Sequence, residues 1–206
     1  MSLRRASVLA AVVAGVLTAA CGGSTSQTPS PSASAPSQLT PSASAPATPV
    51  ALDPCAIVTS AEASTLAGAS FGAGREETTS GGAKTCVYGY QTLNVFTIVV
   101  TQASDPATAQ TAYDNAKAQA QAQLSQGAPS GVKFNVNLSD TSISGADRAS
   151  AATGTGTISG QTISISAVYV LKGSVFFTFA DLVLGHAAPA LSLMEAQATT
   201  SLGRLP

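Results

Sequence analysis

The stretch from Asp53 to Glu62 marks the point where an unstructured tether ends and a folded domain begins. It reads Asp-Pro-Cys-Ala-Ile-Val-Thr-Ser-Ala-Glu, so a cysteine comes shortly before a capping box formed by Thr59 and Glu62. A disulfide can hold the cysteine, and a capping box fixes the start of a helix. We therefore expect residues 51–206 to form a single domain organised around this corner.

The N-terminal residues have the pattern of an export signal. Two arginines precede an apolar run from Ala6 to Ala20, which is too short to span a bilayer comfortably and ends in small residues. Residues 17–21, Leu-Thr-Ala-Ala-Cys, resemble a bacterial lipobox, whose cysteine receives a lipid and becomes the mature N-terminus. We predict a signal peptide at 1–20 and lipidation of Cys21. The alternative is a plain secreted protein.

Residues 22–50 are rich in Ser, Pro, Ala and Thr and contain no charged residue. Such a segment cannot bury enough apolar surface to offset its ordering entropy, and its prolines favour extended conformations. At about 3.1 Å per residue, this disordered tether would hold the domain several tens of ångströms from the membrane. The predicted location is therefore extracytoplasmic, with the protein anchored to the cell membrane by its lipid.

The charge balance argues against nucleic acid as a partner. The chain has 9 basic and 10 acidic residues, and Arg4 and Arg5 in the leader are two of the basic ones. Binding to phosphates requires clustered cations, and no such cluster occurs in the domain. The expected partners are the membrane, through the N-terminal lipid, and an unknown envelope protein or small ligand.

Cys55 and Cys86 remain once Cys21 is assigned to the lipid. An even pair of cysteines in an exported domain is most simply a disulfide. Closing a loop of about thirty residues would stabilise the fold by roughly 3 to 4 kcal/mol. The chain has one histidine, His186, and its two remaining thiols are expected to be paired, so we expect no metal site and no cofactor.

Hydrophobic periodicity and turn residues predict an α+β fold. We expect an antiparallel sheet of about five to six strands packed by three helices, with a loop at 71–83. The predicted helices span 59–67, 105–127 and 188–202, with Pro106 and Pro189 in the first turns of the second and third. The predicted strands span 85–90, 95–101, 132–138, 148–158, 162–171 and 174–182.

The last two predicted strands are apolar on both faces. If Lys172-Gly173 is a two-residue turn, Tyr169 lies opposite Phe176 on one face and Val168 lies opposite Phe177 on the other. The hairpin must therefore be covered on both sides, either by helices or by a ligand.

Two glycines leave space beside this hairpin. A tight turn at Gly160-Gln161 would place Gly154 and Gly156 on the same face as Tyr169 and Phe176. The alanine-rich face of the helix predicted at 105–127 could fill that space by close packing. The alternative is that these four residues form the floor of a pocket for an apolar ligand.

Three short motifs resemble a family of actinobacterial secreted lipoproteins of unknown function. They are residues 53–62, Cys86-Val87-Tyr88 and residues 144–149, Ser-Gly-Ala-Asp-Arg-Ala. The family opens its domain with Asp-Pro-Cys-x-Leu-Leu-Thr, where this chain has Ile57-Val58, and carries a later Gly-x-Gly-Asp-x-Ala turn, where this chain has Ala146. The resemblance implies a Cys55–Cys86 disulfide, a non-catalytic module, and an architecture similar to mycobacterial kinase sensor domains and PsbP-like lipoproteins.

Residues 68–72 match the G-x-S-x-G pattern of a nucleophile elbow, with Ser70 as nucleophile and His186 and Asp147 or Asp181 downstream. The elbow needs a strand before the serine and a helix after it, whereas here a helix comes before and a loop after. We therefore predict a non-catalytic binding or sensor-like module. The alternatives are a carrier of an apolar small molecule or lipid and, less favoured, a serine hydrolase using Ser70 and His186.

Overall fold

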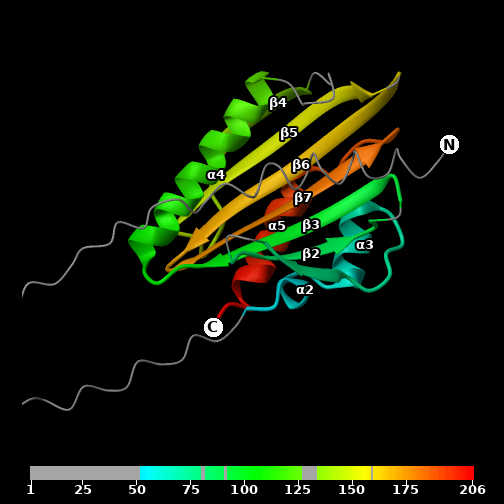
Figure 1. Ribbon diagram of the computed structural model, residues 1–206. Helices are drawn as coiled ribbons and strands as arrows, with labels where there is room; N and C mark the ends of the chain where they lie inside the picture. Colours follow the sequence, from blue (N-terminus) through cyan, green and yellow to red (C-terminus); the bar gives the residue numbers. More distant parts are fainter. Residues whose placement is uncertain (1–51, 80–81, 91, 127–133, 159) are drawn as a thin grey trace, which may run out of the picture.

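The computed structural model describes residues 52–79, 82–90, 92–126, 134–158 and 160–206. In these residues seven strands form one antiparallel sheet, and four helices accompany it (Figure 1). The strands are β1 (Arg75–Thr78), β2 (Lys84–Tyr88), β3 (Asn94–Gln102), β4 (Phe134–Thr141), β5 (Arg148–Ile158), β6 (Gln161–Lys172) and β7 (Val175–Leu184). The helices are α2 (Pro54–Ile57), α3 (Ser60–Ala67), α4 (Pro106–Gln126) and α5 (Leu191–Leu202). The predicted α+β class and antiparallel sheet are confirmed.

The described residues contain one strand and one helix more than expected. Strand β1 lies in the segment 71–83 that was expected to be a loop, and it pairs with β2 along its full length. All four of its residues are exposed, so its sequence carries no apolar alternation that could have signalled a strand. Helix α2 is a single turn capped by Asp53, whose carboxylate accepts from the Cys55 amide at 2.8 Å. One turn is too short to show a helical period.

The sheet order is β1-β2-β3-β7-β6-β5-β4, so the C-terminal hairpin lies near its centre. Helices α2, α3 and α5 pack on one face, called here the α5 face, and α4 packs on the other, the α4 face (Figure 1). The larger core cluster, which includes Phe96, Phe177 and Phe179, lies on the α5 face. A smaller cluster containing Tyr169 and Phe176 lies under α4. Helices therefore cover parts of both faces of the hairpin.

The hairpin register differs from the prediction by two residues. Lys172 pairs with Val175, so Phe176 lies opposite Leu171 and Phe177 lies opposite Val170. The predicted pairs Tyr169–Phe176 and Val168–Phe177 are therefore wrong. The turn uses Gly173, which has a φ of +54°, and the residue after it. A shift of two residues keeps every side chain on its face, so the predicted division between the two faces holds.

The helix boundaries follow their caps. The Thr59–Glu62 capping box is present, and α3 ends at Gly68 in the left-handed region with a φ of +60°. Helix α5 begins at Leu191, with Ala190 as its N-cap, so the prediction that Pro189 lies in its first turn is wrong. Ala190 has an extended backbone, and the Pro189 carbonyl accepts from the Ser166 hydroxyl on β6 at 2.6 Å, so the chain enters the helix only after residue 190.

Candidate functional site

Cys55 and Cys86 form the predicted disulfide, which joins α2 to β2 with the two Cα atoms 5.3 Å apart. Cys86 is fully buried. Tyr88, two residues further along β2, donates from its hydroxyl group to the carbonyl of Val58 at 2.8 Å. The disulfide and this hydrogen bond together fix the start of the domain to the sheet.

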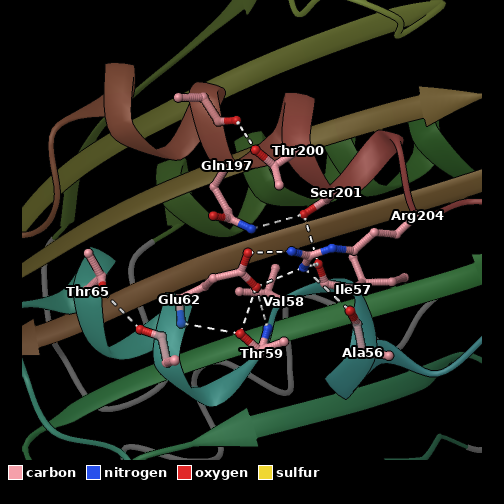
Figure 2. Close-up of polar contacts among 12 residues, drawn as sticks. Ala56, Ile57, Val58, Thr59, Glu62, Thr65, Gln197, Thr200, Ser201 and Arg204 are labelled. Carbon is pink, nitrogen blue, oxygen red and sulfur yellow. Dashed lines mark hydrogen bonds and ion pairs between the residues drawn. The ribbon is translucent and has the colours of Figure 1, made fainter.

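A second connection joins the start of the domain to its C-terminal end, as Figure 2 shows. We call Thr59, Glu62, Ser201 and Arg204 the clasp. Arg204 donates to the two carboxylate oxygens of Glu62 at 2.5 and 2.8 Å, and to the Ile57 carbonyl at 2.7 Å. Ser201 donates to the same carbonyl at 3.0 Å. Arg204 is the main reason that the pKa of Glu62 is lowered to about 2. The clasp is a tightly satisfied polar cluster.

The polar side chains between β3 and β7 differ from those of the clasp, because several of them lack hydrogen-bond partners among the described residues. Four side chains there have buried polar atoms without a hydrogen-bond partner in the described structure: Asn94, Thr97, Thr178 and Asp181. We call these four residues the seam. An unsatisfied buried polar group costs about 1 to 3 kcal/mol and is uncommon in native proteins, so each case calls for an explanation. Four of them on two adjacent strands make the seam the candidate functional site.

Asp181 lies on the α5 face of the seam. Its side chain is fully buried, and neither carboxylate oxygen has a hydrogen-bond partner among the residues that the structure describes. The residues opposite it are Phe96 on β3 and Ser166 on β6, and the hydroxyl of Ser166 donates instead to the carbonyl of Pro189 at 2.6 Å. Burial raises the pKa of Asp181 to about 7. Near neutral pH this carboxyl group can therefore either donate or accept a hydrogen bond.

Thr97 and Thr178 lie on the opposite, α4 face of the seam. Thr97 pairs with Ala180 and Val99 pairs with Thr178, so the two threonines are diagonal neighbours on one face. Their hydroxyl oxygens are buried, and in the described part of the chain neither has a hydrogen-bond partner. No residue of β3, β6 or β7 on this face carries a charge. The residues are Val95, Val99, Thr101, Gln161, Ile163, Ile165, Ala167, Tyr169, Leu171, Phe176, Ala180, Leu182 and Leu184, together with the two threonines. This face thus combines two hydroxyl groups with uncharged surroundings.

A polar network beneath α4 was missed by sequence reasoning. The hydroxyl groups of Tyr113 and Ser150 are 2.5 Å apart, and Ser150 donates to Asp140 at 2.7 Å. Lys117 pairs with Asp140 and lowers the pKa of that carboxyl group, and Arg148 lies 4.8 Å over the Tyr113 ring. Helical spacing places the tyrosine and the lysine on one side of α4, but only the strand register brings the serine opposite the aspartate. Because the tyrosine and serine are fully buried, the network holds α4 to the sheet.

The structure brings the four predicted pocket residues to the α4 face. Gly154 pairs with Ile165 and Gly156 with Ile163, which places both glycines on the face that carries Tyr169 and Phe176. A Cβ atom added at Gly154 would lie 2.3 Å from a methyl group of Val136 on β4. Phe176 makes an edge contact with a tyrosine of α4, with ring centroids 5.8 Å apart. Tyr169 belongs to the core cluster beneath α4, so side chains of the protein lie against three of the four residues.

The residues of the hydrolase alternative are placed as follows. Ser70 and His186 are both exposed, and no hydrogen bond joins them in the described structure. Helix α3 comes before Ser70 and strand β1 after it. Asp147 accepts from the Gly173 amide at 2.6 Å, and Asp181 is buried in the seam. Neither aspartate has a hydrogen bond to His186 in the structure as described.

One cluster of possible metal-ligand atoms occurs in the described residues, formed by Asp53, Cys55 and Glu76 within 4.8 Å of one another. The sulfur of Cys55 belongs to the disulfide and is not a free thiolate. The Asp53 carboxylate is the main cause of a raised pKa at Glu76. Two exposed carboxylates alone offer fewer ligands than Ca²⁺ normally takes.

Cys21 and the predicted leader and tether lie outside the described residues. Among the helices that the structure describes, none has the length and apolar character needed to cross a membrane. No protein-family model matches the chain, and no curated protein matches its sequence.

Proposed function

We propose that this protein is a lipid-anchored extracytoplasmic module that binds an envelope partner or small ligand without catalysis. The export leader, Cys21 in its lipobox-like run and the uncharged tether support the anchoring. The Cys55–Cys86 disulfide fits an oxidising compartment outside the cytoplasm.

The seam is the single observation that most favours binding. In the clasp, the Glu62 carboxylate and the Arg204 guanidinium satisfy each other. In the seam, two hydroxyl groups, one amide oxygen and a carboxyl group are buried with no hydrogen-bond partner among the described residues. A bound molecule that donates to or accepts from these groups would remove their desolvation cost, and its affinity would stabilise the folded state.

The anchoring part of the proposal is tested by changing Cys21 to Ser. The wild-type protein should incorporate a labelled fatty acid and sediment with the cell membrane. The C21S variant should carry no label and appear in the medium or the soluble fraction. An unlabelled wild-type protein in the cytosol would contradict the anchoring.

The binding part is tested by native mass spectrometry of the mature protein purified from the organism that makes it. We expect an added mass that is lost on unfolding. The Thr97→Val/Thr178→Val double variant and the Asp181→Asn variant each remove one side of the seam, and at least one should lose the added mass. Thr141→Val is the matched control, because the Thr141 hydroxyl already donates to Glu195 at 2.7 Å. A clean apo mass for the wild type, or covalent labelling of Ser70 by a fluorophosphonate probe, would contradict the proposal.

A carrier of an apolar small molecule or lipid is the second candidate, and the α4 face of the seam favours it. The strand residues on that face are uncharged, and the two threonine hydroxyls match the ester or carbonyl oxygens of a lipid. Solvent extraction of the purified protein separates the two candidates: a carrier releases a lipid-soluble compound, whereas a partner-binding module releases none. In a carrier, the double threonine variant should lose the compound and Asp181→Asn should keep it.

A further inference from the structure

Among the residues that the structure describes, the sheet ends in two strands, β1 and β4, and each pairs with a strand on one side only. Strand β1 has four residues, of which Arg75, Glu76 and Glu77 are charged. A short, charged edge resists pairing with another chain. Strand β4 has eight residues and pairs with β5 along its whole length, and Asp140 is its one charged residue. Its free side therefore offers a long row of backbone donors and acceptors with little to prevent an additional strand.

The two faces of β4 differ in chemistry. Val136 and Leu138 lie on the α4 face and pack partly against the cluster beneath that helix. Asn135, Asn137 and Ser139 point to the other face and are exposed. A strand added at this edge must bring apolar side chains to the first face and polar side chains to the second, because directly opposed residues share a face.

Strand β4 meets this requirement itself. With a two-fold axis through Asn137, an antiparallel copy of β4 places Asn137 opposite Asn137, Asn135 opposite Ser139, and Val136 opposite Leu138. Polar residues then face polar residues, and apolar residues face apolar ones. Asp140 lies opposite position 134, so the two carboxylates are kept apart.

We propose that β4 pairs antiparallel with β4 of a second copy about an axis at Asn137, so that two sheets join into one symmetric dimer. A closed two-fold contact uses the same surface from both copies, which the near-palindromic pattern Asn-Val-Asn-Leu-Ser allows. Both α4 helices lie on the same side of the joined sheet. The dimer does not require the ligand of the seam or the lipid anchor.

Cysteine cross-linking of the mature protein tests the register directly. Asn137→Cys should give a covalent dimer on mild oxidation, because residues directly opposed across antiparallel strands have Cβ atoms about 4.5 to 5.5 Å apart. Asn135→Cys or Ser139→Cys alone should give little dimer, whereas a mixture of the two should give the mixed dimer. Glu77→Cys on β1 is the control at the other edge and should stay monomeric. Peptide mapping of the product should show that Cys55–Cys86 is intact.

The unlinked dimer is tested by sedimentation with Asn137→Lys, which places two ammonium groups opposite each other at an exposed site. The dissociation constant should rise at least about tenfold, and Thr78→Lys on β1 should leave it unchanged. A wild-type protein that sediments as a monomer at high micromolar concentration would overturn the proposal. So would equal cross-linking by the single cysteines at 135, 137 and 139, because that result indicates random collision.

Discussion

The clasp and the seam each contain a carboxyl group, but the two groups differ in their hydrogen bonds and in the direction of their pKa shifts. In the clasp, Glu62 receives two hydrogen bonds from Arg204, and the pKa of its carboxyl group is lowered to about 2. In the seam, Asp181 receives no hydrogen bond from any described residue, and burial raises the pKa of its carboxyl group to about 7. One carboxyl group is stabilised in its charged form and the other in its neutral form. The clasp therefore maintains the fold, whereas the seam holds buried polar atoms that make no hydrogen bond to the described residues.

The position of each region fits this difference. The clasp and the disulfide connect the first helices of the domain to its last helix and to β2. The seam lies between two strands in the interior of the sheet, where strand pairing already fixes the backbone. A binding site can tolerate unpaired groups when rigid elements hold them in place, because the fold supplies the stability that the site lacks.

Removing the disulfide should give the largest change in stability. In the Cys55→Ser/Cys86→Ser variant, the loop that spans a sequence separation of 31 is no longer closed in the unfolded chain. The free energy of unfolding should fall by roughly 3 to 4 kcal/mol. Denaturant titration measures this loss, and hydrogen exchange should show it in the most protected amides of β6 and β7 as well as in α2 and β2, because the loop entropy acts on global unfolding. An unchanged unfolding midpoint would show that the corner does not hold the fold.

Asp181→Asn should change the pH dependence of stability. The raised pKa of Asp181 gives a stabilising contribution that is complete below the ordinary value of 3.8 and is lost as the pH rises to about 7. The variant has no such loss and should be more stable than the wild type above pH 7 by about 3 kcal/mol, with little difference near pH 4. Thermal unfolding at a series of pH values measures this.

Asp147→Asn is the control for that experiment, because Asp147 is half exposed and pairs with Lys172. It should reproduce the wild-type slope between pH 4 and pH 7. If Asp181→Asn also reproduces that slope, the carboxyl group has a partner in solution, and the contrast between seam and clasp is lost.

Glu62→Gln should lower stability at neutral pH and remove part of its loss in acid. The lowered pKa of Glu62 gives a contribution that is present above the ordinary value of 4.5 and is lost as the pH falls to about 2. Because a quarter of the side chain is exposed, we expect the variant to be less stable than the wild type by only about 2 kcal/mol at neutral pH. This difference should disappear as the pH falls to about 2. Glu77→Gln on β1 should leave the acid unfolding curve unchanged. A wild-type-like curve for Glu62→Gln would show that Arg204 does not stabilise the native state.

How far the sequence predicts each region depends on the range of the interactions that form it. The Thr59–Glu62 capping box and the stop at Gly68 were predictable, because both involve residues a few positions apart. The bond from Arg204 to Glu62 spans 142 positions and leaves no local pattern. The seam was equally hidden, because it depends on β3 lying beside β7, and an unpaired hydroxyl has no signature in a sequence. The turn predicted between β6 and β7 assigned each side chain to the correct face of the sheet, but it gave cross-strand pairs that are shifted by two residues.

Thr178→Val should give the smallest change in stability, and unlike most substitutions it should stabilise the protein. Valine has nearly the shape of threonine, and the Thr178 hydroxyl is buried with no partner in the residues described. Its removal should therefore stabilise the unliganded domain by about 1 kcal/mol. Thr141→Val removes a hydroxyl that donates to Glu195 at 2.7 Å, so it should destabilise by about the same amount. Unfolding titrations of both variants therefore compare an unpaired threonine with a paired one in the same sheet. If Thr178→Val destabilises the protein as Thr141→Val does, then the Thr178 hydroxyl has a hydrogen-bond partner in the purified protein. Mass spectrometry of that sample then shows whether the partner is a bound molecule.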